Sequence, residues 1–227
     1  MDPKRGREPF WPVAAAVAAA AFALIAPALR RGDGLLPVGM LWRVPPWNAV
    51  LPPTPGNGLL SDQLLAFWPW RLFLRSQLLA GHFPLWNPLI DCGAPFLANV
   101  QAAVLYPTTL LLTVLSPAAW SLADAFLKLT AAGVFAGLHA RRLGASRAGA
   151  ALSGVAFALC GFMVAWLGHP QTNVACLLPA LFWALGRAFD AGVPRAWIAP
   201  ALVVAVLLLG GHPPTQLYVL TAGACYA

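Results

Sequence analysis

The chain has 227 residues, which is enough for one or two soluble domains, but its composition argues against a soluble protein. Hydrophobic residues make up 60% of the sequence and charged residues only 9%, whereas an ordinary soluble domain carries about 25% charged residues. The mean hydropathy is +0.73. The 22 Pro and 20 Gly follow no period and lie among large apolar residues, which excludes collagen-like and disordered chains. We therefore expect an integral membrane protein.

The formal net charge of +7 does not indicate a nucleic-acid partner. The 14 Lys and Arg residues are scattered singly and in pairs around apolar segments, where such residues set the topology of a membrane protein. The cysteines show no CxxC spacing, so neither a disulfide framework nor a zinc knuckle is predicted. They are Cys92, Cys160, Cys176 and Cys225.

The apolar runs predict an all-α polytopic bundle with a large, structured first external loop. Because a membrane-spanning helix needs about 20 apolar residues, we place complete spans near 10–29, 117–140, 148–168, 172–189 and 196–211. The first lacks a small-residue cleavage site, so it is predicted to be an uncleaved span. A sixth span begins near 215 and reaches the last residue, 227, which predicts that the chain is the amino-terminal part of one transmembrane domain of a longer protein.

The distribution of basic residues predicts a cytoplasmic amino terminus and an external loop at 30–116. Eight of the 14 basic residues then lie in cytoplasmic segments, namely Lys4, Arg5, Arg7, Arg141, Arg142, Arg147, Arg187 and Arg195. Arg30 and Arg31 oppose this rule, but long external segments carry less weight than short ones.

The loop at 30–116 contains five of the ten Trp residues, which suit a membrane interface. Within it we predict an amphipathic helix from Trp70 to Ala80, with Pro69 in its first turn and Gly81 at its end. The apolar stretch 103–115 is interrupted by Pro107, and we predict an interfacial or re-entrant helix there.

An internal repeat places two histidines at equivalent positions. The sequence Gly-His-Pro-Gln-Thr at 168–172 recurs as Gly-His-Pro-Pro-Thr at 211–215, an offset of 43 residues. Two spans and a short turn consume about that many residues, so His169 and His212 should lie on the same face of the membrane, the external one. The alternative is that Gly and Pro merely end helices there and that His is tolerated at an interface.

Two charged residues, Asp124 and Lys128, fall within the predicted span at 117–140. They are spaced i,i+4 on one helical face, and intramembrane charges are costly and usually paired. We predict a structural ion pair. The alternative is that Asp124, less than two turns from the outer end, joins an external site.

Several loop motifs in order resemble those of the bacterial YfhO family of multispanning membrane proteins. They are Asp62 before Pro69-Trp70-Arg71, the Pro-Leu-Trp-Asn-Pro turn at 84–88, Gly-Ala-Pro-Phe-Leu-Ala-Asn-Val-Gln at 93–101, Tyr106-Pro107, the basic turn at 140–144 and both Gly-His-Pro turns. The resemblance covers roughly residues 59–216. Asp91-Cys92 and Pro214 depart from the family pattern.

The resemblance implies a glycosyltransferase-C-like protein of the bacterial plasma membrane that uses a polyprenyl-phosphate-linked sugar donor and a cell-envelope polymer or lipid acceptor. By this resemblance Asp62 is the loop acid, and its chemistry suits a general base for the acceptor hydroxyl. Candidates for the donor phosphate and substrate are Arg71, Arg75, His169, His212, Gln171, Asn87, Asn99 and Gln101, since Arg offers a bidentate fork and protonated His adds charge. No cofactor is expected, and membrane lipids are expected partners.

Other roles for these residues stay open. Asp62 could cap a short helical turn, Arg71 and Arg75 could attract anionic headgroups, and the Asn and Gln side chains could bind local backbone. A divalent metal at Asp62, His169 and His212 is an alternative without any short ligand spacing to support it. The alternative functions are a transporter or flippase of lipid-linked saccharides and a non-catalytic envelope assembly protein.

Overall fold

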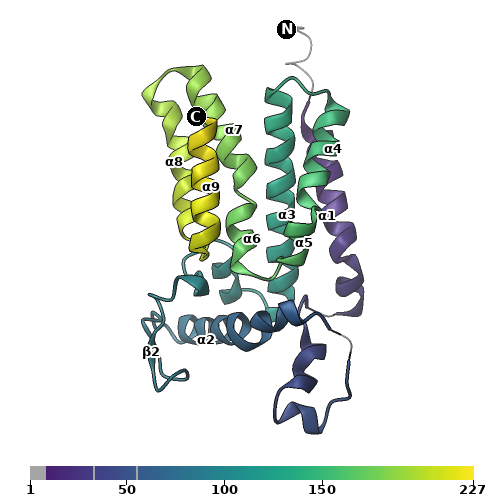
Figure 1. The fold of residues 1–227 in the computed structure, drawn as a ribbon, viewed down its shortest axis with the longest axis vertical. Helices are drawn as coiled ribbons and strands as arrows, with labels where there is room; N and C mark the ends of the chain where they lie inside the picture. The colour runs from purple at the N-terminus through teal and green to yellow at the C-terminus, as the bar shows by residue number, and fades with distance from the viewer. Residues whose placement is uncertain (1–8, 33, 55) are drawn as a thin grey trace.

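A computed structural model of the protein describes residues 9–32, 34–54 and 56–227. Long helices stand side by side in a bundle, and residues between the first two of them form a separate layer at one end (Figure 1). We call this layer, residues 34–54 and 56–116, the loop region. The expected all-α fold is confirmed, because the described residues contain one short antiparallel pair of strands, β1 (Trp86–Asn87) and β2 (Ala94–Pro95), and are otherwise helical or irregular. Lys4, Arg5 and Arg7, used above for orientation, lie outside the described residues.

The bundle consists of helices, and two of its segments of membrane-spanning length are each interrupted by a short break. Its members are α1 (Trp11–Arg31), α3 (Pro117–Arg142), α4 (Arg147–Ala158), α5 (Gly161–Ala165), α6 (Pro170–Ala175), α7 (Leu178–Ala191), the 3-10 helix η8 (Pro194–Trp197), α8 (Ile198–Leu208) and α9 (Pro213–Tyr226). Helices α4 and α5 together, and α6 and α7 together, replace two predicted continuous spans.

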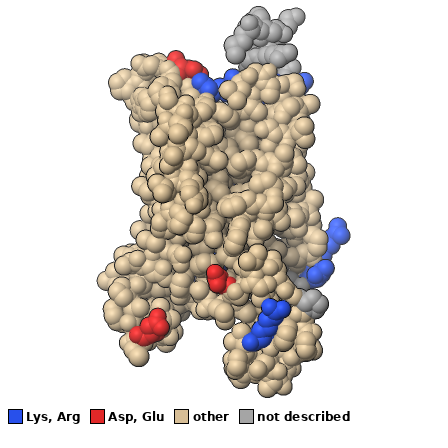
Figure 2. Space-filling model, viewed as in Figure 1, with Lys and Arg blue, Asp and Glu red and all other residues tan. Residues whose placement is uncertain are grey.

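Within the described residues, four helical segments are long and apolar enough to cross a membrane, which indicates a membrane protein. They are Trp11–Arg31, Pro117–Arg142, Arg147–Ala165 and Pro170–Ala191. The segments predicted near 196–211 and 215–227 form shorter helices, Pro194–Leu208 and Pro213–Tyr226. Figure 2 shows that the coloured Lys, Arg, Asp and Glu residues in this view gather toward the two ends, with an uncharged belt of bundle surface between them.

Small residues set the spacing of α1, α3 and α4. A Cβ on Gly133 would lie 2.7 Å from the carbonyl oxygen of Gly154 and a Cβ on Gly154 would lie 2.6 Å from that of Gly133, so the two backbones approach closely. Buried Val17 of α1 fills the space beside both glycines, and buried Val13 lies against Gly137 of α3. Close approach at small residues is the usual way in which helices pack within lipid, where apolar contact alone gives no preference.

The loop region is built from short pieces around one longer helix, α2 (Trp68–Leu79). The helix predicted at 70–80 is thereby confirmed, with Pro69 in its first turn and Gly81 in the left-handed conformation after it. Short 3-10 helices are η2 (Val38–Arg43), η3 (Trp47–Ala49), η4 (Gly58–Leu60), η6 (Val100–Ala102) and η7 (Thr109–Thr113), and the π-helix η5 (Gln63–Phe67) leads into α2.

The helix predicted over 103–115 is wrong. Ala103 adopts a left-handed φ of 47°, and only η7 at 109–113 is helical. Pro107 has no N–H to donate and its ring excludes a continuous helix through this stretch, so the chain turns there instead. Buried Tyr106 and Leu112 attach these turns to the bundle.

Candidate functional site

The main cavity of interest lies where the loop region meets the bundle, and we call it the Arg71 pocket. Its volume is about 450 Å³. Apolar side chains from α1, α2 and α3, including Leu24, Ile25, Trp68 and Trp120, make up one part of its wall. Its polar part consists of Asn57, Gln63, Arg71, Ser121 and Asp124. An apolar wall with a few converging polar groups is the usual make-up of a small-molecule site.

Arg71 is held in this wall by two contacts. Its Nη2 donates to the carbonyl oxygen of Gly168 at 3.0 Å, and its guanidinium lies over the Trp120 ring at 4.7 Å from the centroid. Burial lowers the pKa of Arg71 to about 10, while the nearby charge of Asp124 acts in the opposite direction. The group therefore stays positively charged at neutral pH, and its remaining N–H donors can serve a ligand in the pocket.

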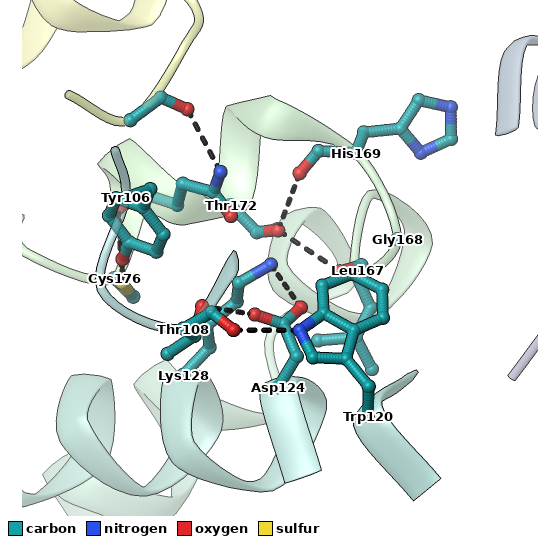
Figure 3. A network of polar contacts seen from close by, with 12 residues as sticks. Tyr106, Thr108, Trp120, Asp124, Lys128, Leu167, Gly168, His169, Thr172 and Cys176 are labelled. Atoms are coloured by element: carbon teal, nitrogen blue, oxygen red, sulfur yellow. Dashed lines mark hydrogen bonds and ion pairs between the residues drawn. The ribbon is translucent and has the colours of Figure 1, made fainter. Parts of the chain in front are cut away.

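Behind Arg71, the predicted ion pair within α3 is confirmed. Lys128 Nζ lies 2.5 Å from Asp124 Oδ2, and both side chains are buried. The hydroxyl of Thr108 donates to the other oxygen of Asp124, and the Trp120 Nε1 donates to the carbonyl oxygen of Thr108 at 2.7 Å (Figure 3). Asp124 also lines the pocket, so the ion pair and a contribution to the pocket wall coexist.

His169 does not line the pocket but contacts Gln63, which does. Gln63 Nε2 lies 3.2 Å from His169 Nδ1, and the ring packs edge to face against Phe67 and Trp166. Because an amide nitrogen can only donate, Nδ1 accepts and the proton of the neutral ring is on Nε2. That Nε2 is buried without a hydrogen-bond partner of good geometry among the described residues.

The charge expected on His169 is not supported at neutral pH. Burial lowers the pKa of His169 to about 4, and this outweighs the opposite effects of the Asp62 charge and the Leu59 backbone. The imidazole is therefore neutral at pH 7 and can offer an N–H but no positive charge. In Figure 3 its ring points away from Asp124 and Lys128.

Asp62 immediately precedes Gln63, at the start of η5, and is exposed. Its carboxylate makes no capping hydrogen bond to η5, so the capping role considered for it is absent from the structure. Asp62 lies next in the chain to Gln63, whose Nε2 is 3.2 Å from His169 Nδ1, and the Asp62 charge accordingly acts to raise the pKa of His169. The π-helical turn of η5 aligns Asp62 outside, Gln63 toward the pocket and Phe67 against the His169 ring.

The second histidine of the repeat has a different environment. His212 caps α9, because its Nδ1 accepts from the Thr215 backbone N–H at 3.3 Å and lies 2.8 Å from the Thr215 hydroxyl. Burial alone lowers the pKa of His212, with no contribution from Asp62. The two Gly-His-Pro turns lie at the same end of the bundle, where α6 and α9 begin (Figure 1). His169, and not His212, is therefore the histidine that contacts Gln63, the chain neighbour of Asp62.

The two Gly-His-Pro turns also contact the loop region, and the residues that follow them bond to the end of α8. A Cβ on Gly168 would overlap the Gln63 side chain, and one on Gly211 would lie 2.7 Å from the Val100 carbonyl oxygen. At the position after each repeated Thr, Asn173 donates to the Gly210 carbonyl at 2.9 Å and Gln216 donates to the Leu208 carbonyl at 3.0 Å. The two repeats thus satisfy carbonyl groups at the end of α8.

The remaining candidates are engaged or lie elsewhere in the loop region. Arg75 Nε donates to the Leu112 carbonyl at 3.0 Å, which ties α2 to η7. Asn87 is buried and its Oδ1 accepts from the Leu89 N–H at 2.9 Å, the local backbone bond considered for it. Asn99 precedes η6 without capping it, and Gln101 is exposed. Gln171 Oε1 is buried without a hydrogen-bond partner among the described residues.

Two contributors to this region, Gln63 and Thr108, carried no sequence signal, because they are ordinary polar residues in an apolar loop and no spacing sets them apart. Tyr106 belongs to the Tyr-Pro motif named above, but the sequence did not indicate what it contacts. Tyr106 donates to the Asn173 carbonyl at 2.9 Å, which connects the loop region to α6. In the part of the chain that the structure describes, no group of three His, Cys, Asp or Glu side chains is arranged to hold a metal ion.

Comparisons of this chain with protein-family models, with curated proteins and with solved structures find no match.

Proposed function

We propose that the chain is a membrane glycosyltransferase of the glycosyltransferase-C type, as its resemblance to the YfhO family implies. The donor is a polyprenyl-phosphate-linked sugar, and the acceptor is a hydroxyl group of a cell-envelope polymer or lipid. In the reaction the bond between the anomeric carbon and the phosphate oxygen breaks, and the acceptor oxygen bonds to that carbon. The acceptor proton goes to Asp62, and polyprenyl phosphate leaves.

The observation that carries the proposal is the Arg71 pocket. It combines an apolar wall, suited to the first isoprene units of a donor, with a cation that stays charged at neutral pH. A guanidinium held by the Gly168 carbonyl and the Trp120 ring is already oriented before the ligand arrives. Pre-oriented donors that stabilise the departing phosphate are an effective form of catalysis, because they need no reorganisation during the reaction.

The environment of Asp62 suits the part of a general base. An exposed carboxylate without a capping bond is free to approach an acceptor hydroxyl. The next residue, Gln63, lines the pocket and is held by His169. We assign His169 as a positioning residue that acts through Gln63, and Arg71 as the phosphate-binding residue.

We also propose that the protein resides in the bacterial plasma membrane with a cytoplasmic amino terminus and an external loop region. The basic residues of the α3–α4 turn and of α7 and η8 lie at the end of the bundle opposite the loop region (Figure 1). That distribution agrees with the positive-inside rule.

Two observations favour a second candidate, a transporter or flippase of lipid-linked saccharides. Two segments of membrane-spanning length are broken, between α4 and α5 and between α6 and α7, and the Asp124–Lys128 pair is buried within α3. Broken helices and buried charges are typical of transporter binding sites. The two candidates differ in whether the sugar leaves its lipid.

The test is sugar transfer by the Asp62→Asn variant. Asn keeps the shape of the side chain but cannot take up a proton at neutral pH, and loss of a general base costs about 10²–10⁴-fold in rate. Asp91→Asn is the matched control, since Asp91 is another exposed acid of the loop region and its left-handed φ of 48° suits Asn. Both variants are compared at equal amounts in membranes. Equal transfer by Asp62→Asn and the unaltered protein would refute the assignment.

A further inference from the structure

A second groove lies at the end of the bundle opposite the loop region, between α7, η8 and α8. Its volume is about 420 Å³. Its lining includes two cationic side chains, Arg187 and Arg195, and three large apolar ones, Trp183, Ile198 and Leu202. We call it the α7–α8 groove. It is separate from the Arg71 pocket and shares no lining residue with it.

The local sequence explains how the two arginines come to lie together. Gly192 adopts a left-handed φ of 61° and ends α7, and Val193 is extended. Pro194 starts η8, because its fixed φ suits a first helical position and it needs no N–H partner there. This tight reversal brings Arg195 back beside the last turns of α7, where Arg187 lies.

Neither arginine is neutralised by a carboxylate in the described part of the chain. The nearest acid in sequence, Asp190, is taken by Arg142, whose Nη2 donates to both of its oxygens at 2.8 Å. Arg187 instead lies over the Trp183 ring at 5.0 Å from the centroid. Both arginines are exposed, so the mouth of the groove carries two charges without an anion.

The apolar part of the groove continues along α8. Ile198 and Leu202 lie one turn apart and are 60% and 62% exposed. Trp197, packed edge to face on Phe189, stands at the same end, as Trp does at a membrane interface. The groove thus has two cations at one end and an apolar surface along α8, which is complementary to a molecule with an anionic head and a long apolar tail.

We propose that the α7–α8 groove binds a single anionic phospholipid, with its phosphate between Arg187 and Arg195 and one acyl chain along Ile198 and Leu202. Basic pockets between membrane helices bind anionic headgroups in this way, and such lipids surround the protein in its membrane. A soluble anion would contact only the two arginines and would leave the apolar part of the groove uncovered. The site has no part in sugar transfer, so it does not depend on the function proposed above.

The experiment measures binding of phosphatidylglycerol to the purified chain in detergent by native mass spectrometry, with phosphatidylcholine of the same acyl chains as the neutral comparison. The variant is Arg187→Gln/Arg195→Gln. Each basic residue near an anionic surface strengthens binding about fivefold, so we expect the variant to bind phosphatidylglycerol about 25-fold more weakly. Binding of phosphatidylcholine should not change.

Two further variants make the result specific. Arg30→Gln/Arg31→Gln removes the same number of charges from exposed positions at the end of α1 and should change binding less than twofold. Arg187→Lys/Arg195→Lys keeps the charges and should restore most of the affinity, which separates a charge effect from misfolding. Equal weakening in the Arg30/Arg31 variant, displacement of the lipid by glycerol phosphate alone, or a dimer that only the Arg187/Arg195 variant abolishes would each overturn the proposal.

Discussion

Replacing Lys128 by Met tests the polar contacts behind the Arg71 pocket. The substitution keeps the length of the side chain but removes the charge that lies 2.5 Å from Asp124 Oδ2. Lys128 and Asp124 are 2% and 4% exposed, so no solvent replaces the lost partner. Thr108 still donates to the other carboxylate oxygen. Removing one partner of a buried pair typically costs about 3–5 kcal/mol, because the other charge remains buried and unpaired.

For a chain of this size, that loss corresponds to a fall of about 6–20 °C in the unfolding temperature. The assay is thermal unfolding of the purified protein in detergent, followed by intrinsic Trp fluorescence. The double variant Asp124→Asn/Lys128→Met removes both charges and should recover most of the loss. Leu127→Met, at an exposed neighbouring position, is the control and should change little. If Lys128→Met unfolds within 2 °C of the unaltered protein, the buried pair does not stabilise this region.

Three further predictions concern contacts between the loop region and the bundle, each measured as the free energy of unfolding. Gly168→Ala should destabilise by about 1–3 kcal/mol because its Cβ would overlap Gln63, whereas Gly161→Ala, with open space around it, should not; equal effects would contradict the packing argument. The pKa of His169 is lowered from 6.5 to about 4, so stability is fully present above pH 6.5 and is lost, by up to about 3 kcal/mol, as the pH falls toward 4. His169→Gln should remove that pH dependence, whereas His82→Gln, at an exposed position of the loop region, should keep it. If the stability of His169→Gln depends on pH as that of the unaltered protein does, His169 is not the group responsible. Tyr106→Phe removes the hydroxyl that donates to the Asn173 carbonyl, leaves that carbonyl only the weaker Cys176 thiol donor, and should cost about 1–2 kcal/mol. Exposed Tyr218→Phe should be neutral, and the reverse order would contradict this role.

The helices could be predicted from the sequence where hydrophobicity alone decides the structure. The apolar runs of α1 and α3 leave no other conformation in which their backbone groups are satisfied within lipid. Pro69 and Gly81 mark the two ends of α2 for equally local reasons. The Asp124–Lys128 pair follows from its spacing on a helix and from the cost of an isolated charge.

The breaks within helices were not predicted, because their cause is not local composition. Hydropathy around Cys160 and Cys176 is as high as in the adjoining helices, yet the helix is interrupted at both places. The stretch after Ala103 was predicted to be helical because it is apolar. Its turns instead depend on Pro107 and on the tertiary contact of Tyr106 with α6.

In the candidate site, too, some residues could be predicted from the sequence and others could not. Asp62 and Arg71 could be singled out by motif and charge, but Gln63, which connects the pocket to His169, could not. His169 and His212 have the same sequence neighbours on both sides, and only their tertiary surroundings differ. One meets Gln63 of the loop region, whereas the other bonds to Thr215 of its own helix.

The most direct measurement of the central claim is the fate of the donor lipid. The chain is reconstituted in vesicles that contain an acceptor and a polyprenyl-phosphate sugar with separate labels on the sugar and on the lipid. Sugar transfer predicts that labelled acceptor and free polyprenyl phosphate appear in equal amounts, and that both are lost in Asp62→Asn but retained in Asp91→Asn. Movement of the intact donor across the bilayer, with both labels still on one molecule, would contradict sugar transfer and establish the transporter instead.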